Sequence, residues 1–209
     1  MTNKNIKLII FDGYGVIFNG GFPQTCTKLS QLFKRNKAEL YKIIYTKYFN
    51  QAATKKISQQ QAWGKAIKEL DLPISVDEIK KIHYSFMNIN RAVLSLAKEA
   101  KQNYKIILLT KNTRPQLRDA LLLMPEVREV FEKNIINTWE YNLAKASQKT
   151  IQMIANKYRV KLTEVVYIDD QAENLKSAKN LGVTTILYST FPDFKKKLLN
   201  HCPPKALPL

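Results

Sequence analysis

Short runs of branched apolar residues alternate along the chain with longer segments in which apolar residues recur every three or four positions. The apolar runs are residues 7–11, 104–110, 165–168 and 184–188, with a weaker run at 134–137. Runs of this length that stop at glycine or at polar residues are typical of buried parallel strands. The segments 93–100, 151–158 and 175–181 have helical spacing instead. The alternation predicts an α/β fold, a Rossmann-like, doubly wound parallel sheet.

Residues 20–90 follow a different pattern, because their apolar positions have helical spacing throughout. Ser58 with Gln61 has the spacing of a capping box at the start of a helix, and Ser75 with Glu78 repeats it. We therefore expect an α-helical cap inserted after the first strand. The predicted division is an α/β core of residues 1–19 and 91–200, a helical cap of residues 20–90, and a tail of residues 201–209. We expect the tail to lie loose on the surface.

The composition is that of an ordinary globular protein with an unusual charge. Among 209 residues, 45% are hydrophobic, which excludes a disordered or collagen-like chain. Lys and Arg number 34 against 17 Asp and Glu, a net charge of +17. Such an excess favours anionic partners. It is spread over both 20–90 and 91–209, with one tight run at Lys195–Lys197. This distribution argues against nucleic acid or an anionic membrane as the partner, and helix faces rich in solvated lysine are the simpler interpretation.

Neither the cysteines nor the apolar segments of the sequence indicate a membrane protein or an oxidising compartment. Its two cysteines, Cys26 and Cys202, are not in a CxxC motif. The apolar run after Met1–Lys7 is too short for a membrane span or for the core of a signal peptide. We expect a cytoplasmic protein without a membrane partner, and the sequence leaves its oligomeric state open.

Polar residues follow three of the predicted strands at their carboxyl ends. They are Asp12 in the first strand, Thr110, Lys111 and Asn112 in the second, and Asp169 and Asp170 in the third. In an open parallel sheet these ends converge on one crevice, where ligands bind. Three carboxylates crowded together cannot all ionise at neutral pH without a counter-charge. Mg²⁺, which takes carboxylate and carbonyl oxygens, would supply one, and Lys145 could add further positive charge.

The same motifs, taken in order, resemble those of the haloacid dehalogenase-like (HAD) hydrolase superfamily. They are Asp12-Gly-Tyr-Gly-Val16 after the first strand, the strand ending in Thr110, Lys145 opening a predicted helix, and Val165-Val-Tyr-Ile-Asp-Asp-Gln-Ala-Glu-Asn174. The helical insertion is similar to the type 1 cap of that superfamily. The resemblance extends from about Ile6 to Tyr188, nearly the whole chain.

The resemblance implies a phosphatase acting on a small phosphorylated metabolite. Asp12 would be the nucleophile that attacks phosphorus and forms a covalent aspartyl phosphate. Thr110 would hydrogen-bond a phosphoryl oxygen, and Lys145 would neutralise the nucleophile and the transferring group. Asn112 and Asn174 are candidate substrate contacts. Lys111 stands where the superfamily often has Asn, and it could contact an anionic substrate or simply face solvent.

The resemblance also implies a Mg²⁺ site. The ion would bind Asp12, the backbone carbonyl of Tyr14, and Asp170. Asp169 would contribute by holding a water molecule bound to the metal. These are the oxygen ligands that Mg²⁺ prefers.

One position departs from the phosphatase pattern. HAD phosphatases usually have a second Asp two residues after the nucleophile, where this chain has Tyr14. Loss of a positioned acid–base group costs on the order of 10²–10⁴ in rate. A tyrosine hydroxyl, with an ordinary pKa of about 10, is a poor base at neutral pH. The sequence therefore predicts a slow phosphatase.

The first motif also leaves two other functions open. Asp-x-Tyr-Gly is the pattern of the L-2-haloacid dehalogenase branch, whose members use no metal and lack the later acidic pair. Here Asp169 and Asp170 favour a metal, and the run Leu40–Ile44 has no arginine that could take up halide. The alternatives to the phosphatase are a metal-independent dehalogenase that forms an ester on Asp12, and a catalytically impaired binding or regulatory protein.

Several candidates also have a purely structural interpretation. Asp169 and Asp170 could cap the helix that follows them, and Lys145 could lie on the polar face of its helix. His83 lies on the apolar stripe of a cap helix, so we expect it to be buried and hydrogen-bonded rather than in contact with substrate.

Overall fold

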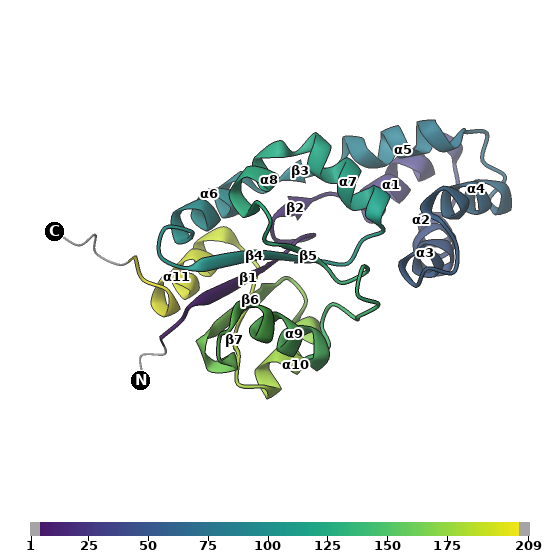
Figure 1. The fold of residues 1–209 in the computed structure, drawn as a ribbon. Coiled ribbons are helices and arrows are strands. Elements are labelled where there is room, and N and C mark those ends of the chain that lie inside the picture. The colour runs from purple at the N-terminus through teal and green to yellow at the C-terminus, as the bar shows by residue number, and fades with distance from the viewer. Residues whose placement is uncertain (1–4, 205–209) are drawn as a thin grey trace. The chain divides into compact units, whose positions relative to one another are not determined.

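The computed structural model describes residues 5–204 and contains one five-stranded sheet in the order β5-β4-β1-β6-β7 (Figure 1). The strands are β1 (Leu8–Asp12), β4 (Lys105–Thr110), β5 (Ile135–Asn137), β6 (Val165–Asp169) and β7 (Thr184–Leu187). All neighbouring strands of this sheet are parallel. The structure confirms the α/β, Rossmann-like fold and the five strands that the apolar runs predicted.

Helices cover both faces of this sheet, which explains why its strands are continuous apolar runs. One face is covered by α6 (Arg91–Ala100), α8 (Pro125–Phe131) and α11 (Phe191–His201), and the other by α9 (Gln148–Tyr158) and α10 (Ala172–Asn180) (Figure 1). A short 3₁₀ helix, η2 (Leu162–Glu164), leads into β6. The strand residues Leu8, Ile10 and Val165 are fully buried against α9 and α10.

The strand order places three strand ends side by side. Strand β1 is central: β4 and then β5 lie on one side of it, and β6 and then β7 lie on its other side. Asp12, Thr110 and Asp169 are the last residues of three adjacent parallel strands. Since parallel strands end at the same edge, these residues share the carboxyl edge of the sheet at its switch point, where ligands bind in such folds.

The contacts between residues divide the chain into two compact units. Unit 1 contains the sheet and comprises the residues up to Phe18, Ile89–Lys111, and the residues from Pro125 onward; unit 2 comprises Asn19–Asn88 and Asn112–Met124. Unit 2 therefore contains the helical insertion and also α7 (Arg114–Leu123), which the sequence had assigned to the core. The predicted cap boundaries at 20 and 90 stay a prediction.

Polar side chains join α7 to the other helices of unit 2. The hydroxyl of Thr113, the residue before α7, donates to Oε1 of Gln59 at 3.2 Å. Gln59 Nε2 donates to the hydroxyl of Tyr84 at 3.3 Å, and that hydroxyl donates to Oδ2 of Asp119 on α7 at 3.0 Å. These bonds explain why a segment that is distant in the sequence belongs to this unit.

Unit 2 is otherwise helical, as the sequence predicted, although it contains more helices than the sequence pattern indicated. These helices are α1 (Phe22–Phe33), α2 (Lys37–Tyr41), the π-helix η1 (Lys42–Phe49), α3 (Asn50–Ala53), α4 (Gln59–Glu69) and α5 (Val76–Ser85). Both capping boxes are confirmed. The backbone N–H of Gln61 donates to Ser58 Oγ at 3.1 Å, and that of Glu78 donates to Ser75 Oγ at 3.2 Å. His83 is fully buried and hydrogen-bonded to Thr25, as expected.

Two local features differ from the sequence prediction. Strands β2 (Phe18–Asn19) and β3 (Asn88–Ile89) pair in a small second sheet, and two-residue strands are too short to leave a pattern. The described part of the tail is packed rather than loose: Cys202 is buried, and the hydroxyl of Tyr104 donates to the carbonyl of Pro203 at 2.7 Å. Residues 205–209 of the predicted tail lie outside the described residues.

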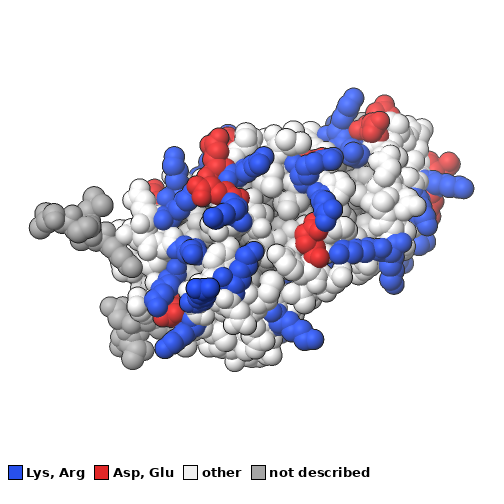
Figure 2. All heavy atoms as spheres, in the orientation of Figure 1, with Lys and Arg blue, Asp and Glu red and all other residues white. Residues whose placement is uncertain are grey.

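The surface carries many positive side chains. On the face shown in Figure 2, Lys and Arg are scattered among Asp, Glu and uncharged residues rather than gathered in one stripe. Within residues 5–204, every helix is too short or too polar to cross a membrane.

Candidate active site

The carboxyl edge of the sheet brings three acidic side chains together. Asp12 ends β1, Asp169 ends the adjacent β6, and both are buried. Asp170 follows in the loop before α10. One carboxylate oxygen from each residue lies within 4.8 Å of the other two. The structure thus places side by side the three carboxylates that the sequence indicated from separate motifs, and oxygen atoms at such spacing suit a hard divalent cation.

Lys145 contacts two of these carboxylates. Its Nζ lies 2.6 Å from Oδ2 of Asp12 and 3.0 Å from Oδ2 of Asp169. The sequence prediction that Lys145 opens a helix is wrong in detail. Helix α9 begins at Gln148 after its N-cap Ser147, so Lys145 lies in the turn before the helix. That turn follows the carboxyl end of β5, which brings the ammonium to the edge where the acidic residues lie.

Two glycines let the loop after β1 approach the other strand ends. At Gly13, a Cβ atom would lie 3.1 Å from Oγ1 of Thr110, a tight contact. Gly15 has a φ of +94°, which favours glycine, and a Cβ atom there would overlap the carboxylate of Asp170. The loop therefore lies directly against Thr110 and Asp170, and it carries Tyr14 between these two contacts.

Asp169 is surrounded by hydrogen-bond donors. Its Oδ1 accepts from the backbone N–H of Gln171 and from the side-chain amide of Asn174, both at 3.0 Å. Its Oδ2 accepts from the hydroxyl of Tyr167 at 2.6 Å and also contacts Lys145. A carboxylate has about four acceptor positions, so protein donors occupy those of Asp169. The other two carboxylates are therefore better placed to bind a cation directly.

The site contains more negative charge than Lys145 can balance. Burial raises the pKa of Asp12 to about 7, with Lys145 acting against the shift and Asp169 adding to it. Burial, followed by the charge of Asp169, also raises the pKa of Asp170. Two carboxylates that resist ionisation indicate a site that lacks positive charge, and a divalent cation would supply it.

Asp169 and Lys145 are held in their charged forms. Burial alone would raise the pKa of Asp169, but Lys145 and the hydrogen bonds from Tyr167 and Asn174 hold that pKa below its ordinary value. Burial likewise acts against the charge on Lys145, yet Asp12 and Asp169 raise the pKa of Lys145 above its ordinary value. Asp169 and Lys145 therefore form an ion pair in which each partner favours the charged form of the other.

The remaining predicted residues differ in their surroundings. Thr110 is buried at the end of β4, whereas Lys111 is exposed. Asn112 is buried and belongs to unit 2. Tyr14 is partly buried, with its ring 5.3 Å from that of Phe18. The substrate contacts predicted for Lys111, Asn112 and Asn174 stay predictions, although the side chain of Asn174 is bonded to Asp169.

One residue of the site was missed in the sequence. Tyr167 was counted only as part of an apolar strand, yet its hydroxyl bonds Asp169. Side chains two apart on a strand lie on the same face. A tyrosine two residues before a strand-ending aspartate was therefore a usable indication of this contact.

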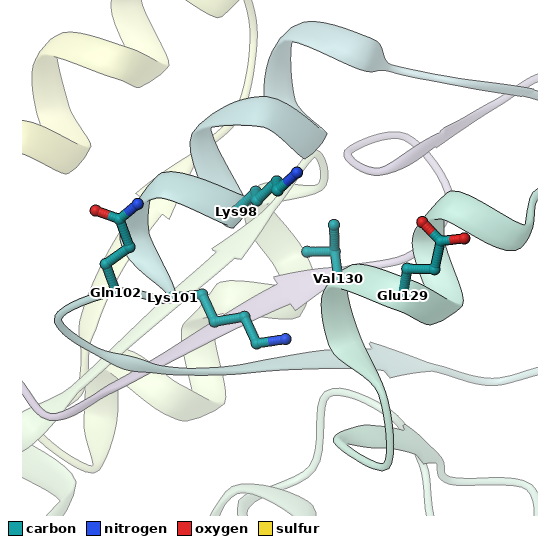
Figure 3. Close-up of a pocket in the computed structure, with 5 residues that line it drawn as sticks. All are labelled: Lys98, Lys101, Gln102, Glu129 and Val130. Carbon is teal, nitrogen blue, oxygen red and sulfur yellow. The ribbon is translucent and has the colours of Figure 1, made fainter.

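A separate surface hollow lies elsewhere in unit 1 (Figure 3). It has a volume of about 290 Å³ and is lined by Lys98, Lys101, Gln102, Glu129 and Val130. Lys98 lies in the last turn of α6, and Lys101 and Gln102 follow that helix shortly before β4 begins, so the hollow is near the amino end of the strand that carries Thr110 at its other end. Lys101 already pairs with Glu132 at 2.7 Å. The hollow is not part of the carboxylate cluster.

Comparison with known protein families assigns nearly the whole chain to one family. A sequence profile of haloacid dehalogenase-like hydrolases matches residues 6–182. That range includes all the residues of the carboxylate cluster together with Lys145.

Several solved structures have the same fold. A HAD-family enzyme from Bacteroides thetaiotaomicron, in complex with magnesium and inorganic phosphate, is 19% identical, with a TM-score of 0.74 over 88% of this chain and 94% of that one. A predicted HAD-like hydrolase from Porphyromonas gingivalis is 15% identical, with a TM-score of 0.72 over 93% and 98%. The L-2-haloacid dehalogenase of Xanthobacter autotrophicus is 14% identical, with a TM-score of 0.63 over 95% and 85%. At these identities the likeness concerns the fold alone.

Proposed function

Because this chain belongs to the haloacid dehalogenase-like hydrolase family, we propose that it is a Mg²⁺-dependent phosphatase of a small phosphorylated metabolite. The observation that carries the proposal is the cluster of Asp12, Asp169 and Asp170 with Lys145 between two of them. A catalyst of phosphoryl transfer mainly positions groups and balances charge. A nucleophilic carboxylate beside a cation site and an ammonium meets both needs.

The proposed Mg²⁺ ligands are Asp12, Asp170 and the backbone carbonyl of Tyr14. All are oxygen atoms, as Mg²⁺ requires. Gly15 supports this set because its missing side chain lets the loop that carries Tyr14 lie against Asp170. When bound, Mg²⁺ would neutralise charge on the phosphoryl oxygens. Asp169 takes part by holding Lys145 rather than by direct ligation.

In the proposed reaction Asp12 attacks phosphorus with one carboxylate oxygen. The new bond is an acyl phosphate on Asp12, the P–O bond to the metabolite breaks, and the departing alkoxide takes a proton from water. A water molecule then attacks the same phosphorus, which releases inorganic phosphate and restores Asp12. Lys145 balances the charge of the nucleophile and of the transferring group, and Thr110 donates a hydrogen bond to a phosphoryl oxygen.

Tyr14 limits this chemistry in the proposal. It stands where a carboxylic acid would protonate the leaving group and later, as the carboxylate, activate water. A phenol with a pKa of about 10 is too weak an acid for the first task, and it is protonated at neutral pH and so cannot accept a proton in the second. Hydrolysis should therefore depend strongly on how good the leaving group is. An aryl phosphate, whose phenolate leaves without a proton, should react faster than an alkyl phosphate.

The direct test is hydrolysis of p-nitrophenyl phosphate with and without Mg²⁺. We expect phosphate release that requires Mg²⁺ and a much lower rate with an alkyl phosphate such as glycerol 3-phosphate. Binding of Mg²⁺ and phosphate without hydrolysis of either ester would contradict the proposal and would instead indicate a binding or regulatory protein.

Restoring the acid–base group gives a second test. We expect Tyr14→Asp to raise kcat for an alkyl phosphate by about tenfold or more, because a positioned general acid contributes on the order of 10²–10⁴. The rate with p-nitrophenyl phosphate should rise less, since that leaving group needs little acid. Equal rates before and after the substitution, with Mg²⁺ still bound, would mean that Tyr14 does not limit the reaction.

The Asp-x-Tyr-Gly motif keeps dehalogenation as a second candidate. Asp12 would attack the carbon that bears the halogen, displace halide, and form an ester that water then hydrolyses. The pair Asp169 and Asp170 argues against it, because further carboxylates beside Asp12 suit a cation site, and dehalogenation uses no metal. Halide release from 2-chloropropionate in the presence of EDTA would favour this candidate over the phosphatase.

A further inference from the structure

The hydroxyl of Tyr167 belongs to the charge network of the site. Tyr167 is on β6, two residues before Asp169, and the two side chains lie on the same face of the strand. Tyr167 is fully buried, and its hydroxyl donates to Oδ2 of Asp169 at 2.6 Å. A short hydrogen bond from a neutral hydroxyl to a buried carboxylate is among the stronger bonds that a protein makes.

The same oxygen of Asp169 also contacts Lys145. Oδ2 lies 3.0 Å from Nζ of Lys145, which in turn lies 2.6 Å from Oδ2 of Asp12. The ammonium is therefore shared between two carboxylates that compete for it. A second donor on Oδ2 of Asp169 weakens the hold of that carboxylate on Lys145 and leaves the ammonium close to Asp12.

Packing alone does not require a hydroxyl at this position. The ring of Tyr167 lies in a core of apolar side chains that includes Ile10, Ile107 and Val165. A phenylalanine would fill the same space without a polar atom to satisfy. The hydroxyl instead donates to the buried carboxylate of Asp169, so its contribution is to that carboxylate rather than to the core.

We propose that Tyr167 is a positioning residue for Lys145: by donating to Asp169 it keeps the lysine ammonium on the nucleophile Asp12. The inference rests on the proposed function, because the placement of Lys145 matters for catalysis only if Asp12 is the attacking group. It assigns Tyr167 no contact with substrate or metal.

A metal-free crystal structure of Tyr167→Phe tests the placement without relying on activity. We expect an unchanged fold in which Lys145 stays on Asp169 and moves out of ion-pair range of Asp12, to more than about 4 Å. Lys145 still bridging both carboxylates, as in the wild type, would overturn the proposal. This result is decisive even if the wild-type protein hydrolyses no phosphate ester.

Kinetics with p-nitrophenyl phosphate and Mg²⁺ test the consequence. We expect Tyr167→Phe to lower kcat about tenfold, the lower end of the effects of residues that orient ligands, with KM changed less than twofold. The matched control is Tyr158→Phe, which removes a hydroxyl that donates to Asn134 Oδ1 at 3.1 Å on the border of the same core. The control should keep its kcat.

Two kinetic outcomes would overturn the inference. One is an unchanged kcat in Tyr167→Phe. The other is an equal loss in Tyr167→Phe and Tyr158→Phe, with parallel losses of Tm, since that pattern would mean a general cost of removing a core hydroxyl. If the wild type shows no Mg²⁺-dependent hydrolysis, the proposed function fails, and the crystal structure alone decides the placement of Lys145.

Discussion

The two units of this protein bury polar side chains in opposite ways. In unit 1, Asp12 and Asp169 are buried together with the ammonium of Lys145, so each charge has an opposite charge within 3.0 Å. In unit 2, His83 and Trp63 are buried among aromatic rings, with ring centroids 5.4 Å apart. Among residues 5–204, neither His83 Nε2 nor Trp63 Nε1 has a hydrogen-bond partner.

The protonation of His83 follows from its neighbours. The hydroxyl of Thr25 donates its one proton to the carbonyl of Gly21 at 3.0 Å, so it can only accept from His83. Nδ1 of His83 therefore carries the proton and Nε2 is bare. Burial lowers the pKa of His83 to about 4, which keeps the ring neutral. The aromatic cluster around His83 in unit 2 thus keeps a titratable ring neutral, whereas the strand ends of unit 1 bring several charges together, and such a cluster of charges indicates a candidate reactive site.

The largest expected effect is on kcat, and it compares the loss of a carboxylate in unit 1 with the loss of a carboxylate in unit 2. Asp12→Asn removes the proposed nucleophile and should lower kcat for p-nitrophenyl phosphate by about 10⁴-fold or more. The matched change in unit 2 is Asp119→Asn, where the carboxylate accepts from Tyr84 and pairs with Arg118. It should leave kcat within a few-fold. Steady-state kinetics of both variants, with circular dichroism to check folding, is the measurement.

Either of two results would break the comparison. Asp12→Asn with full activity would remove the proposed function. A loss in Asp119→Asn as large as that in Asp12→Asn would mean that the carboxylates of unit 2 are as important for the reaction as those of unit 1.

The second effect is a pH dependence of stability in unit 2. The folded pKa of His83, about 4, lies below its ordinary value of 6.5. The unfolded chain therefore binds a proton first, and the free energy of unfolding falls as pH drops from about 6.5 to about 4. The loss amounts to about 3 kcal/mol and ends once both states are protonated. Below about pH 4, His83 causes no further change in the free energy of unfolding.

Fluorescence can follow unit 2 by itself. The chain has two tryptophans, so Trp139→Phe leaves Trp63, beside His83, as the only one. Urea unfolding of this variant at several pH values should show the predicted decline. In the same background His83→Gln should remove most of it, and His201→Gln, at the exposed end of α11, should not. The same decline in all three variants would assign it to other groups.

The third effect compares two glycines. Gly15→Ala places a Cβ atom on the carboxylate of Asp170 at a φ of +94°, so we expect Mg²⁺ affinity to fall by about 10–100-fold. Gly64→Ala in α4 meets no atom within 4 Å and should instead stabilise the protein by about 0.5–1 kcal/mol. Calorimetric titration with Mg²⁺ measures the first change, and urea unfolding measures the second. Wild-type affinity in Gly15→Ala would mean that the loop does not form the cation site.

The fold was predictable because its determinants are local. Continuous apolar runs identified all five strands, and two capping boxes marked the starts of α4 and α5. Acidic residues at the ends of β1 and β6 had to meet once the strands were parallel neighbours. What the sequence missed depends on contacts between distant segments: α7 joins unit 2 through the bond between Tyr84 and Asp119, which no periodicity records.

The candidate site shows the same limit on a smaller scale. Residue types and strand ends indicated the three carboxylates, but not which of them would be saturated by donors. Asp169 is distinguished from Asp12 only by the donors around it, among them Tyr167 and Asn174. The spacing of Tyr167 and Asp169 indicates that the two side chains share one face of β6, but only the side-chain geometry shows that they bond. The roles within the site were therefore harder to predict than its location.

The smallest effect compares the same substitution in the two units. Tyr84→Phe removes a hydroxyl that donates to Asp119 and accepts from Gln59, and neither residue belongs to the carboxylate cluster. We expect the free energy of unfolding to fall by about 1 kcal/mol, the usual net value of such bonds, with Mg²⁺ affinity unchanged. Tyr167→Phe, in contrast, should act mainly on kcat. Urea unfolding and Mg²⁺ titration of both variants measure the difference. If Tyr84→Phe weakened Mg²⁺ binding as much as Gly15→Ala does, cation binding would not be confined to the carboxylate cluster of unit 1.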